Sequence, residues 1–569
     1  MTRLQTTLII LIAVLSCLPR NAHAQPGTIL EKDQHYSQSF DHAMVTAGEP
    51  LAAEVGREIL RRGGNAVDSA TAVGFALAVT LPRAGNLGGG GFALILDWEG
   101  GVHALDFRET APAELHRDFY LEKNRSSRVG PTAVGVPGTV AGLWEMHQRF
   151  GVLPWEEVVK PAQRLALEGF PVSPWLHDGL QSSHDLLSLY PQTEKIFLPN
   201  SQAPKIGSLF VQKELSDTLA RIAKHGPDDF YRGETAERLT QGVQKAGGVL
   251  SGADLDSYQA KWRKPVSGTF RGYEVWSMPP PSSGGIHLLQ MLKLVENAEL
   301  VASYCNSARQ LHLLAEAMRL AYCDRARYLG DPDFVEVPGD KLLSEDYLES
   351  RRALIPKERA GNSETLAPEL FRAPPSESPD TTHFNVVDER GMAVSLTYTL
   401  NFSYGSGFVA PGTGFLLNNE MDDFNAKPGE PNAYGLIGSE ANNVEAGKRP
   451  LSSMTPTLIT RNGKLFAALG APGGSRIING VFQTTLNLLG YGFNAQTSVT
   501  LPRIHHQWYP DTIFYEMGIS ADTIERLREM GHTLEPIYAV AHVLAIVKEP
   551  SGSLEAGLDP RRPGYAEGY

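Results

Sequence analysis

The chain changes character abruptly at residue 381. Residues 356–380 read PKERAGNSETLAPELFRAPPSESPD, a segment rich in Pro, Ser and Glu and poor in aromatic and β-branched residues. Such a composition packs poorly, so we expect an exposed loop or linker. The sequence that follows, THFNVVDERGMAVSLTYTLN, predicts two strands joined by a turn at Asp388 to Gly391. Residue 381 therefore lies between a predicted exposed loop and a predicted strand that would hold it in place.

Two interpretations of the Asp380–Thr381 junction are open. The first is a linker that meets an ordinary edge strand, since threonine is common in strands. The second is that the chain is cut there and Thr381 becomes a new amino terminus. A threonine hydroxyl inside a chain has no base, but a terminal α-amine, which titrates at about pH 7.7–8.0, can take its proton. The same hydroxyl can make the cut by attacking the Asp380 carbonyl, forming an ester that water resolves.

The first 24 residues have the pattern of a secretory signal peptide. Arg3 precedes a short apolar run from Leu8 to Leu15, and the small residues of AHA at 22–24 fit a cleavage site after Ala24. The run is too short to span a bilayer, which needs roughly 20 residues. Lipidation at Cys17 is the alternative that VLSC leaves open. We expect an exported protein, periplasmic or secreted, that is not embedded in a membrane.

Charge argues against nucleic acid or an anionic membrane as the partner. The whole chain carries a formal charge of −13, and removal of Arg3 and Arg20 with the first 24 residues makes it −15. Length alone, about 545 residues after this removal, suggests three or four domains. No clear linker precedes the 360–380 region, however.

Two cysteines, Cys305 and Cys323, remain after the predicted signal peptide. Apolar residues recur at helical spacing between them, with Ser307 as the expected N-cap and Gly330 as the stop. A helix over 307–323 rises roughly 24 Å, whereas the Cα atoms of a disulfide lie within about 7 Å. We therefore predict two free thiols.

The remaining patterns indicate a mixed α and β chain. Residues 50–63 and 65–82 predict helices, and the next two strand-like runs are joined at 99–101. The middle of the chain, roughly 140–355, is mostly helical. Asn462-Gly463 is the tightest hairpin signal in the carboxyl-terminal part.

Several common site motifs are absent or out of context. Glycines 88–91 follow a predicted helix and open a strand, the reverse of a dinucleotide loop, so close backbone packing explains them better. His505 and His506 are neighbours without the helical zinc spacing, which favours a structural or surface pair. There is no G-x-S-x-G elbow, and neither remaining cysteine has a catalytic signature.

A series of motifs, in order along the chain, resembles one family. They are AGNLGGGGF, DFRETAP, VGVPGTVAGL, PPPSSGGIHLLQ, PDTTHFNVVDERGMAVSLTYTLN, LLNNEMDDF, KRPLSSMTPT, GAPGGSRII and the terminal DPRRPGYAEGY. Together they cover essentially the whole chain beyond the signal peptide. On these motifs the chain resembles the γ-glutamyltransferases (γ-glutamyl transpeptidases).

The resemblance implies an α+β fold of the N-terminal-nucleophile hydrolase type. In this fold two stacked sheets lie between helical layers in a four-layer αββα sandwich, which large and small chains form jointly after self-cleavage. Here the cut between Asp380 and Thr381 gives a large chain of 25–380 and a small chain of 381–569, a heterodimer. Thr381 matches the family nucleophile, and Thr399 matches a residue whose hydroxyl positions it. Gly473 and Gly474 match the oxyanion hole, where backbone N–H groups must approach the oxyanion closely.

The resemblance also implies how a γ-glutamyl donor is held. Arg108 matches a clamp for the α-carboxylate, which a guanidinium can bind through both oxygens. The other matching positions are hydroxyl partners of that carboxylate (Ser452, Ser453), the group that receives the α-ammonium (Asn401, Glu420, Asp423) and a lid residue, Tyr434 in KPGEPNAYGLIG. Taken singly, each has an ordinary structural explanation. Glu420 is glutamine in some bacterial members, and related cephalosporin acylases alter the Asp423 neighbourhood.

The expected activity is therefore that of a self-cleaving γ-glutamyltransferase and glutathione hydrolase without a metal or cofactor. Its donors are glutathione and other γ-glutamyl compounds, and its acceptors are water, amino acids or peptides. An acylase or glutaminase with the same fold is the alternative enzyme. An exported binding or structural protein is the alternative from another class, and it predicts no amide hydrolysis.

Overall fold

The computed structural model describes residues 37–301, 304–367, 381–426 and 440–569. The predicted signal peptide at 1–24, the cleavage-site residue Asp380 and the lid residue Tyr434 lie outside the described residues. None of the helices in the described ranges is long and apolar enough to cross a membrane.

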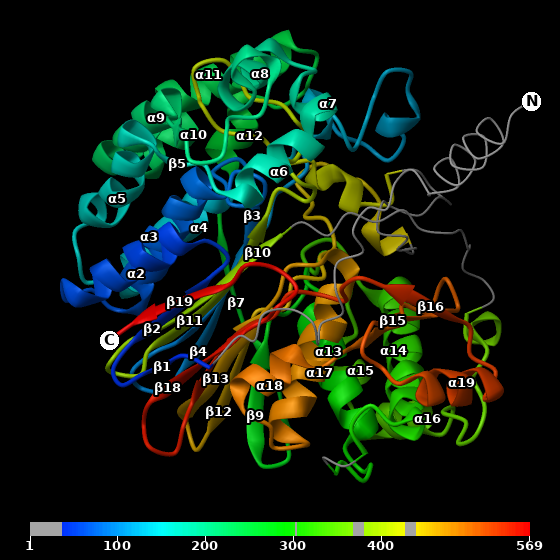
Figure 1. Ribbon diagram of the computed structural model, residues 1–569. Coiled ribbons are helices and arrows are strands. Elements are labelled where there is room, and N and C mark those ends of the chain that lie inside the picture. Colours follow the sequence, from blue (N-terminus) through cyan, green and yellow to red (C-terminus); the bar gives the residue numbers. More distant parts are fainter. Residues whose placement is uncertain (1–36, 302–303, 368–380, 427–439) are drawn as a thin grey trace, which may run out of the picture.

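Two seven-stranded sheets face each other at the centre of the molecule, and all their strands pair antiparallel (Figure 1). In spatial order the first sheet consists of β19 (Tyr565–Gly568), β2 (Met44–Ala47), β10 (Thr382–Val387), β11 (Ala393–Thr399), β3 (Gly90–Leu96), β4 (Val102–Phe107) and β7 (Lys261–Arg263). The second consists of β1 (Ser39–Phe40), β18 (Leu554–Leu558), β17 (Leu544–Lys548), β13 (Lys464–Gly470), β12 (Thr457–Arg461), β9 (Tyr273–Ser277) and β8 (Val266–Phe270).

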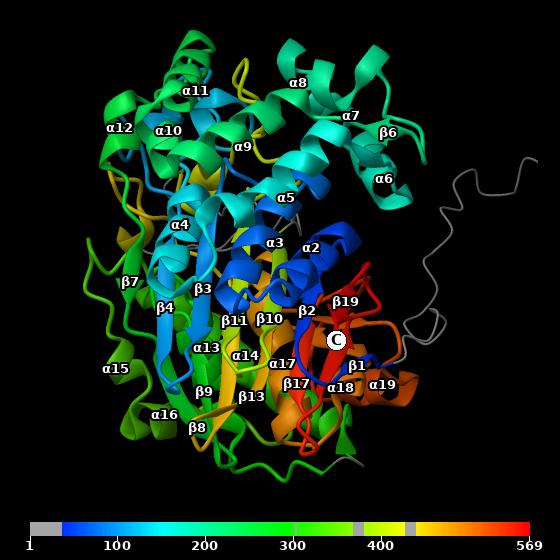
Figure 2. The ribbon, with the colours of Figure 1, turned by 90° about the vertical axis from the view of Figure 1, so that its left-hand side faces the viewer.

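Helices cover the outer faces of both sheets, which gives four layers (Figures 1 and 2). The apolar core under the first sheet includes α2 (Pro50–Arg61), α3 (Ala66–Thr80), α4 (Thr139–Phe150), α5 (Trp155–Glu168) and α9 (Lys213–His225). A second core joins the two sheets to α13 (Gly284–Val295), α14 (Ala308–Tyr328), α17 (Ile477–Leu489) and α18 (Ala495–Thr500). The predicted α+β class and four-layer arrangement are therefore confirmed.

Shorter elements surround these layers. On the side of α5 and α9 they are β5 (Phe170–Pro171), α6 (Pro174–Ser182), α7 (His184–Leu187), α8 (Pro191–Phe197), β6 (Leu209–Phe210), α10 (Pro227–Arg232), α11 (Glu234–Lys245) and α12 (Gly252–Ser257) (Figure 2). Near α13 and α14 they are α15 (Gly339–Leu342), α16 (Glu345–Arg352), β14 (Ile504–His505), β15 (Ile513–Glu516), α19 (Ala521–Glu529) and β16 (Leu534–Ile537).

Sequence on both sides of residue 381 builds each sheet. The first sheet places β10, β11 and β19 among strands from the amino-terminal part, and β12, β13, β17 and β18 do the same in the second. No single cut of the chain separates these strands into independent domains, so the three or four domains suggested by length are wrong for this core. β10 lies between β2 and β11, which also excludes the ordinary edge strand as an explanation for the sequence after residue 381.

Predicted turns and a predicted helix cap are confirmed. The turn after β10 is held by Asp388, whose side chain accepts hydrogen bonds from the backbone N–H groups of Arg390 and Met392. Asn462 and Gly463 both have positive φ, as a tight hairpin between β12 and β13 requires. Helix α3 begins after an Asn65 capping box.

Residues 356–367, the described part of the segment before residue 381, are more firmly anchored than their composition predicts. Half of residues 356–367 are exposed, but Ser363 is fully buried and bonded on several sides. Its carbonyl accepts a hydrogen bond from Trp508 Nε1 at 2.9 Å, and its N–H donates to Asp511 at 3.0 Å. The prediction of an exposed loop therefore holds for only part of residues 356–367. Polar anchors hold Ser363, and composition does not reveal them.

The two cysteines after the signal peptide are not in disulfides, as predicted. Ser307 caps α14 through its side chain, and the helix continues to Tyr328, two residues before the predicted stop at Gly330. Cys323 is buried within this helix, while Cys305 precedes it. Most of α14 thus lies between Cys305, before its first residue, and Cys323, near its carboxyl-terminal end.

Glycines 88–91 are explained by close backbone packing. A Cβ atom at Gly89 would lie 2.0 Å from the Thr399 carbonyl oxygen, and one at Gly91 would lie 2.4 Å from that of Thr397. Real Cβ atoms essentially never approach another atom so closely. The glycines therefore allow β3 and its preceding loop to lie directly against β11.

Gly89→Ala should destabilise the protein, because the new methyl group meets a backbone oxygen that cannot rotate away. We expect a loss of about 3 kcal/mol or more, the upper range for overpacking, measured as a lowered melting temperature. Gly252→Ala is the matched control, since nothing lies within 4 Å of its added carbon. Equal melting temperatures for the two variants would contradict the packing explanation.

Candidate active site

The predicted nucleophile lies beside its predicted partner because of strand register. Thr382 pairs with Tyr398 across β10 and β11, so the preceding Thr381 comes opposite Thr399. The Thr381 hydroxyl donates to the Thr399 hydroxyl at 3.4 Å, and both side chains are buried. Thr399 Oγ1 also accepts the backbone N–H of Asn401 at 2.8 Å.

Three predicted substrate-binding residues meet in a buried charge cluster. Arg108 follows β4, and its two terminal nitrogens donate to Glu420 and Asp423, which lie at the ends of a short 3-10 turn, Glu420–Asp423. Its Nε donates to the Pro450 carbonyl at 3.3 Å. The guanidinium is fully buried, and all of its nitrogens have protein partners. Arg108 is therefore paired with both acids in this state.

Ser452 and Ser453 lie in a loop that is bonded to the start of α13. The N–H and hydroxyl of Ser283 donate to the Ser452 carbonyl at 2.8 and 2.7 Å. The guanidinium of Arg325, on α14, donates to Ser453 Oγ at 3.3 Å and to Ser283 Oγ at 3.0 Å. The sequence interpretation did not include Arg325. A usable signal was present, since residue 325 continues the helical spacing of the apolar residues Leu311, Leu314 and Met318.

The predicted oxyanion residues occupy the turn between β13 and α17. Gly473 has φ +140° and Gly474 has φ +57°, backbone conformations that L side chains rarely adopt. A 3-10 turn, Gly474–Arg476, leads directly into the amino terminus of α17. Gly474 lines the same small cavity as Thr381.

Thr381 borders two small cavities. The first, of about 20 Å³, is lined by most of the predicted site, including Arg108, Thr399, Asn401, Asp423 and Ser453, and has room for about one water molecule. The second, of about 30 Å³, also includes Thr382, Trp175 and two arginines, Arg83 and Arg562.

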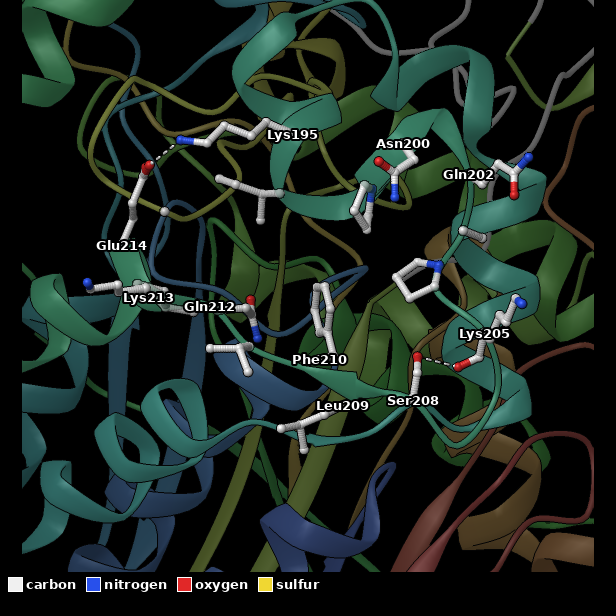
Figure 3. Close-up of a pocket in the computed structure, with 17 residues that line it drawn as sticks. Lys195, Asn200, Gln202, Lys205, Ser208, Leu209, Phe210, Gln212, Lys213 and Glu214 are labelled. Carbon is white, nitrogen blue, oxygen red and sulfur yellow. Dashed lines mark hydrogen bonds and ion pairs between the residues drawn. The ribbon is translucent and has the colours of Figure 1, made fainter.

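A much larger cavity, of about 650 Å³, is lined by residues between Lys195 and Leu215 together with Gly414 (Figure 3). None of the predicted site residues lines it. Lys195, Lys205 and Lys213 lie at its edges in Figure 3, around apolar residues such as Phe210. Cavity size alone would therefore select the wrong region.

Burial controls the charge of the acids around Arg108. It raises the pKa of Glu109 to about 8 and also raises the pKa values of Glu420 and Asp423, while the Arg108 charge acts in the opposite direction. Neither carboxyl oxygen of Glu109 has a hydrogen-bond partner among the described residues. One guanidinium cannot compensate three buried carboxylates, so we take Glu109 to be the neutral member at pH 7.

One group of described side chains has donor atoms close enough to hold a metal ion, namely His312, Glu316 and His532. These atoms are already engaged within the protein. The two ring nitrogens of His312 contact His532 Nε2 and the Pro356 carbonyl, both at 2.7 Å. Glu316 accepts two hydrogen bonds at 3.2 Å from Arg319. The cluster is a satisfied buried network, and we assign no metal to it.

The histidine pair His505–His506 is buried and hydrogen-bonded, which confirms the structural interpretation. His505 contacts Asn479 at 2.7 Å, and His506 Nε2 lies 3.2 Å from Asp511. Burial is the largest cause of the lowered pKa values of both histidines.

The fold is that of the N-terminal-nucleophile hydrolases. Among solved structures, a cephalosporin acylase from Bacillus halodurans matches with a TM-score of 0.84 and 28% identity, covering 97% of this chain and 99% of the acylase chain. A γ-glutamyltranspeptidase from Helicobacter pylori matches with a TM-score of 0.54 and 43% identity, covering 55% of this chain and 91% of its own.

Sequence comparison gives the family. The family model described as gamma-glutamyltranspeptidase matches residues 52–569. A glutathione hydrolase proenzyme from Escherichia coli strain K12 is 44% identical over 538 residues, covering 94% of this chain and 92% of the relative. The chain belongs to the γ-glutamyltranspeptidase family.

Glu109→Gln tests the charge state of the acid cluster through stability. A carboxyl whose pKa rises from 4.5 to about 8 on folding binds its proton more tightly in the folded state. Wild-type stability should therefore fall as the pH rises from about 5 to about 8, and glutamine removes this loss. Melting curves across that pH range should show the stability of the variant increasing relative to that of the wild type as the pH rises.

Glu114→Gln, at an exposed position, provides the control and should track the wild type. A difference between Glu109→Gln and wild type that stays constant with pH would contradict a neutral Glu109.

Proposed function

We propose that this protein is a self-cleaving γ-glutamyltransferase and glutathione hydrolase with Thr381 as its nucleophile. The observation that carries the proposal is the Thr381–Thr399 hydroxyl contact of 3.4 Å at the edge of a cavity that also holds Arg108 and Asp423. The name of the Escherichia coli relative, a glutathione hydrolase proenzyme, supports both the activity and the processing.

Self-cleavage comes first in this proposal. Thr381 Oγ attacks the Asp380 carbonyl, the amide becomes an ester on Thr381, and water hydrolyses the ester to leave a terminal α-amine. β10, a central strand of the first sheet, begins at the next residue, Thr382, which limits the movement of the attacking group. The products are a large chain of 25–380 and a small chain of 381–569. A solved chain of the H. pylori γ-glutamyltranspeptidase covers only 55% of this chain, which agrees with such a division.

Turnover uses the same hydroxyl. The α-amine of Thr381 takes the hydroxyl proton, and Oγ attacks the γ-carbonyl carbon of the donor. Backbone N–H groups at Gly473 and Gly474 receive the developing oxyanion. The C–N bond breaks, the leaving amine takes the proton, and a glutamyl ester remains on Thr381. Water or an amino-acid or peptide amine then attacks the ester.

Opposite charges in the cavity suit the two ends of a glutamyl group. Its α-ammonium needs acceptors, which Asp423, Glu420 and Asn401 provide, and its α-carboxylate needs donors. Arg108 pairs with Glu420 and Asp423 in this state. We expect a zwitterionic donor to replace part of these internal ion pairs. Its ammonium would then bind the acids in place of the Arg108 guanidinium.

The proposal that the enzyme is exported rests on the sequence alone. The pattern of residues 1–24 is that of a signal peptide, and we propose a periplasmic or secreted enzyme. An acylase activity is the second candidate, favoured by the likeness to the B. halodurans cephalosporin acylase. The retained acid at position 423, paired with Arg108, argues for a donor that carries an ammonium group.

Thr381→Ala should abolish both the cut and the activity, because no hydroxyl remains to attack. A denaturing gel should show one band near full length for this variant. The wild type should give two bands, the smaller beginning at Thr381 by amino-terminal sequencing. Thr381→Ser keeps a hydroxyl and should be cut. A wild-type protein that stays as one band would overturn self-processing at this bond.

Asp423→Asn should weaken donors that carry an α-ammonium. Loss of one charged hydrogen bond, about 1.5–3 kcal/mol, should raise KM for γ-glutamyl-p-nitroanilide about tenfold to a hundredfold. Glutaryl-p-nitroanilide lacks the ammonium and should be affected far less. Asp422→Asn is the matched control, because its carboxylate bonds instead to Ser127 and Arg128. A wild-type preference for the glutaryl donor would favour the acylase.

A further inference from the structure

Arg325 is a buried cation that lines the cavity beside Thr381. It lies in the last turn of α14, is 5% exposed, and shares the cavity with Arg108, Ser452 and Ser453. Its guanidinium contacts two hydroxyl groups, Ser283 Oγ and Ser453 Oγ, and forms no ion pair with a carboxylate of the described residues. A buried charge without a countercharge is costly.

Two other buried arginines of this region have carboxylate partners. Arg319, on the same helix, pairs with Glu316 and Asp511. Arg351 pairs with Asp324, the residue next to Arg325 in sequence. The nearby carboxylates Glu316, Asp511 and Asp324 therefore pair with Arg319 and Arg351, and not with Arg325.

Arg108 has no free nitrogen with which to bind an incoming carboxylate while its ion pairs persist. Glu420 and Asp423 occupy its two terminal nitrogens, and the Pro450 carbonyl occupies Nε. The positive charge in this cavity that has no acidic partner among the described residues therefore belongs to Arg325. Its Nη2 reaches the hydroxyl of Ser453, one of the two serines expected to bond the donor carboxylate.

We propose that Arg325 is a positioning and specificity-determining residue, which holds Ser453 and supplies the countercharge for the α-carboxylate of the donor. This inference rests on the proposed function and assigns a role within it. It implies that a ligand with an α-carboxylate is selected over the same ligand without one. Recognition of the α-ammonium remains the task of Asp423 and its neighbours.

The electrostatics of Arg325 agree with this role. Burial lowers its pKa to about 10, and the charge of Arg108 acts in the same direction, while Tyr322 and Asp423 oppose the shift. The group is still cationic at neutral pH. A carboxylate entering the cavity would meet this charge together with the hydroxyl that it holds.

Competitive inhibition by two simple ligands tests the proposal. L-Glutamate carries the α-carboxylate, whereas 4-aminobutanoate has the same chain and ammonium without it. With γ-glutamyl-p-nitroanilide as the reporter, Ki should be measured for both ligands on wild type, Arg325→Gln and Arg325→Lys. In Arg325→Gln we expect the preference for glutamate to fall about tenfold or more, as for the loss of a charged hydrogen bond. Lysine should restore part of it.

Two controls separate this role from damage to the fold. Arg309→Gln removes an exposed arginine from the same helix and should behave as wild type. Processing should be checked on a gel, and if Arg325→Gln is not cut, Arg325→Lys provides the comparison. The double variant Ser453→Ala/Arg325→Lys should lose less of the preference for glutamate than the sum of the losses in the two single variants, since both act on one contact.

The outcomes distinguish the two levels of the hypothesis. No turnover of the γ-glutamyl reporter by wild type would refute the proposed function itself. Wild-type turnover with equal weakening of both inhibitors in the Arg325 variants would overturn the role of Arg325 and leave the function standing. An unchanged ratio of the two Ki values in Arg325→Gln and Arg325→Lys would overturn it as well.

Discussion

The antiparallel pairing of β10 with β11 is the constraint on which the rest of the proposed site depends. It places Thr381 opposite Thr399, at one end of two central strands that cannot shift without breaking the sheet. The glycines before and within β3 let the next strand approach so closely that the carbonyl of Thr399 leaves no room for a side chain at residue 89. A chain cut before residue 381 would keep this geometry, because β10, which begins at Thr382, is hydrogen-bonded to both β2 and β11.

Charge burial is the second organising feature. Arg108, Glu420, Asp423 and Arg325 surround a cavity with little room for water, where electrostatic interactions are strong. Proteins avoid such clusters unless partners compensate them or a ligand does. Here compensation is uneven: Arg108 has two acids, whereas Arg325 has hydroxyl partners. A zwitterionic ligand fits this imbalance better than a neutral or purely anionic one.

Much of the local structure could be predicted from the sequence, since it depends on neighbouring residues. The break at residue 381, the capped helix α14 and the Asn462-Gly463 hairpin are examples. The site residues came from ordered motifs that resemble a family, and composition alone would have left Thr381 ambiguous. What the sequence could not reveal depends on distant contacts, such as the Arg108–Asp423 pair across 315 positions and the anchoring of Ser363 by Trp508. Arg325 belongs to the same class, because only the fold shows that no carboxylate of the described residues pairs with it.

The central claim is that Thr381 carries the glutamyl group during turnover. Mass spectrometry of the processed protein, quenched in acid during steady-state turnover of a γ-glutamyl donor and then digested, tests it most directly. We expect the peptide that begins at Thr381 to gain the mass of one glutamyl group, on the threonine hydroxyl, and to lose it when the donor is exhausted. Turnover with the adduct on another residue would contradict the claim.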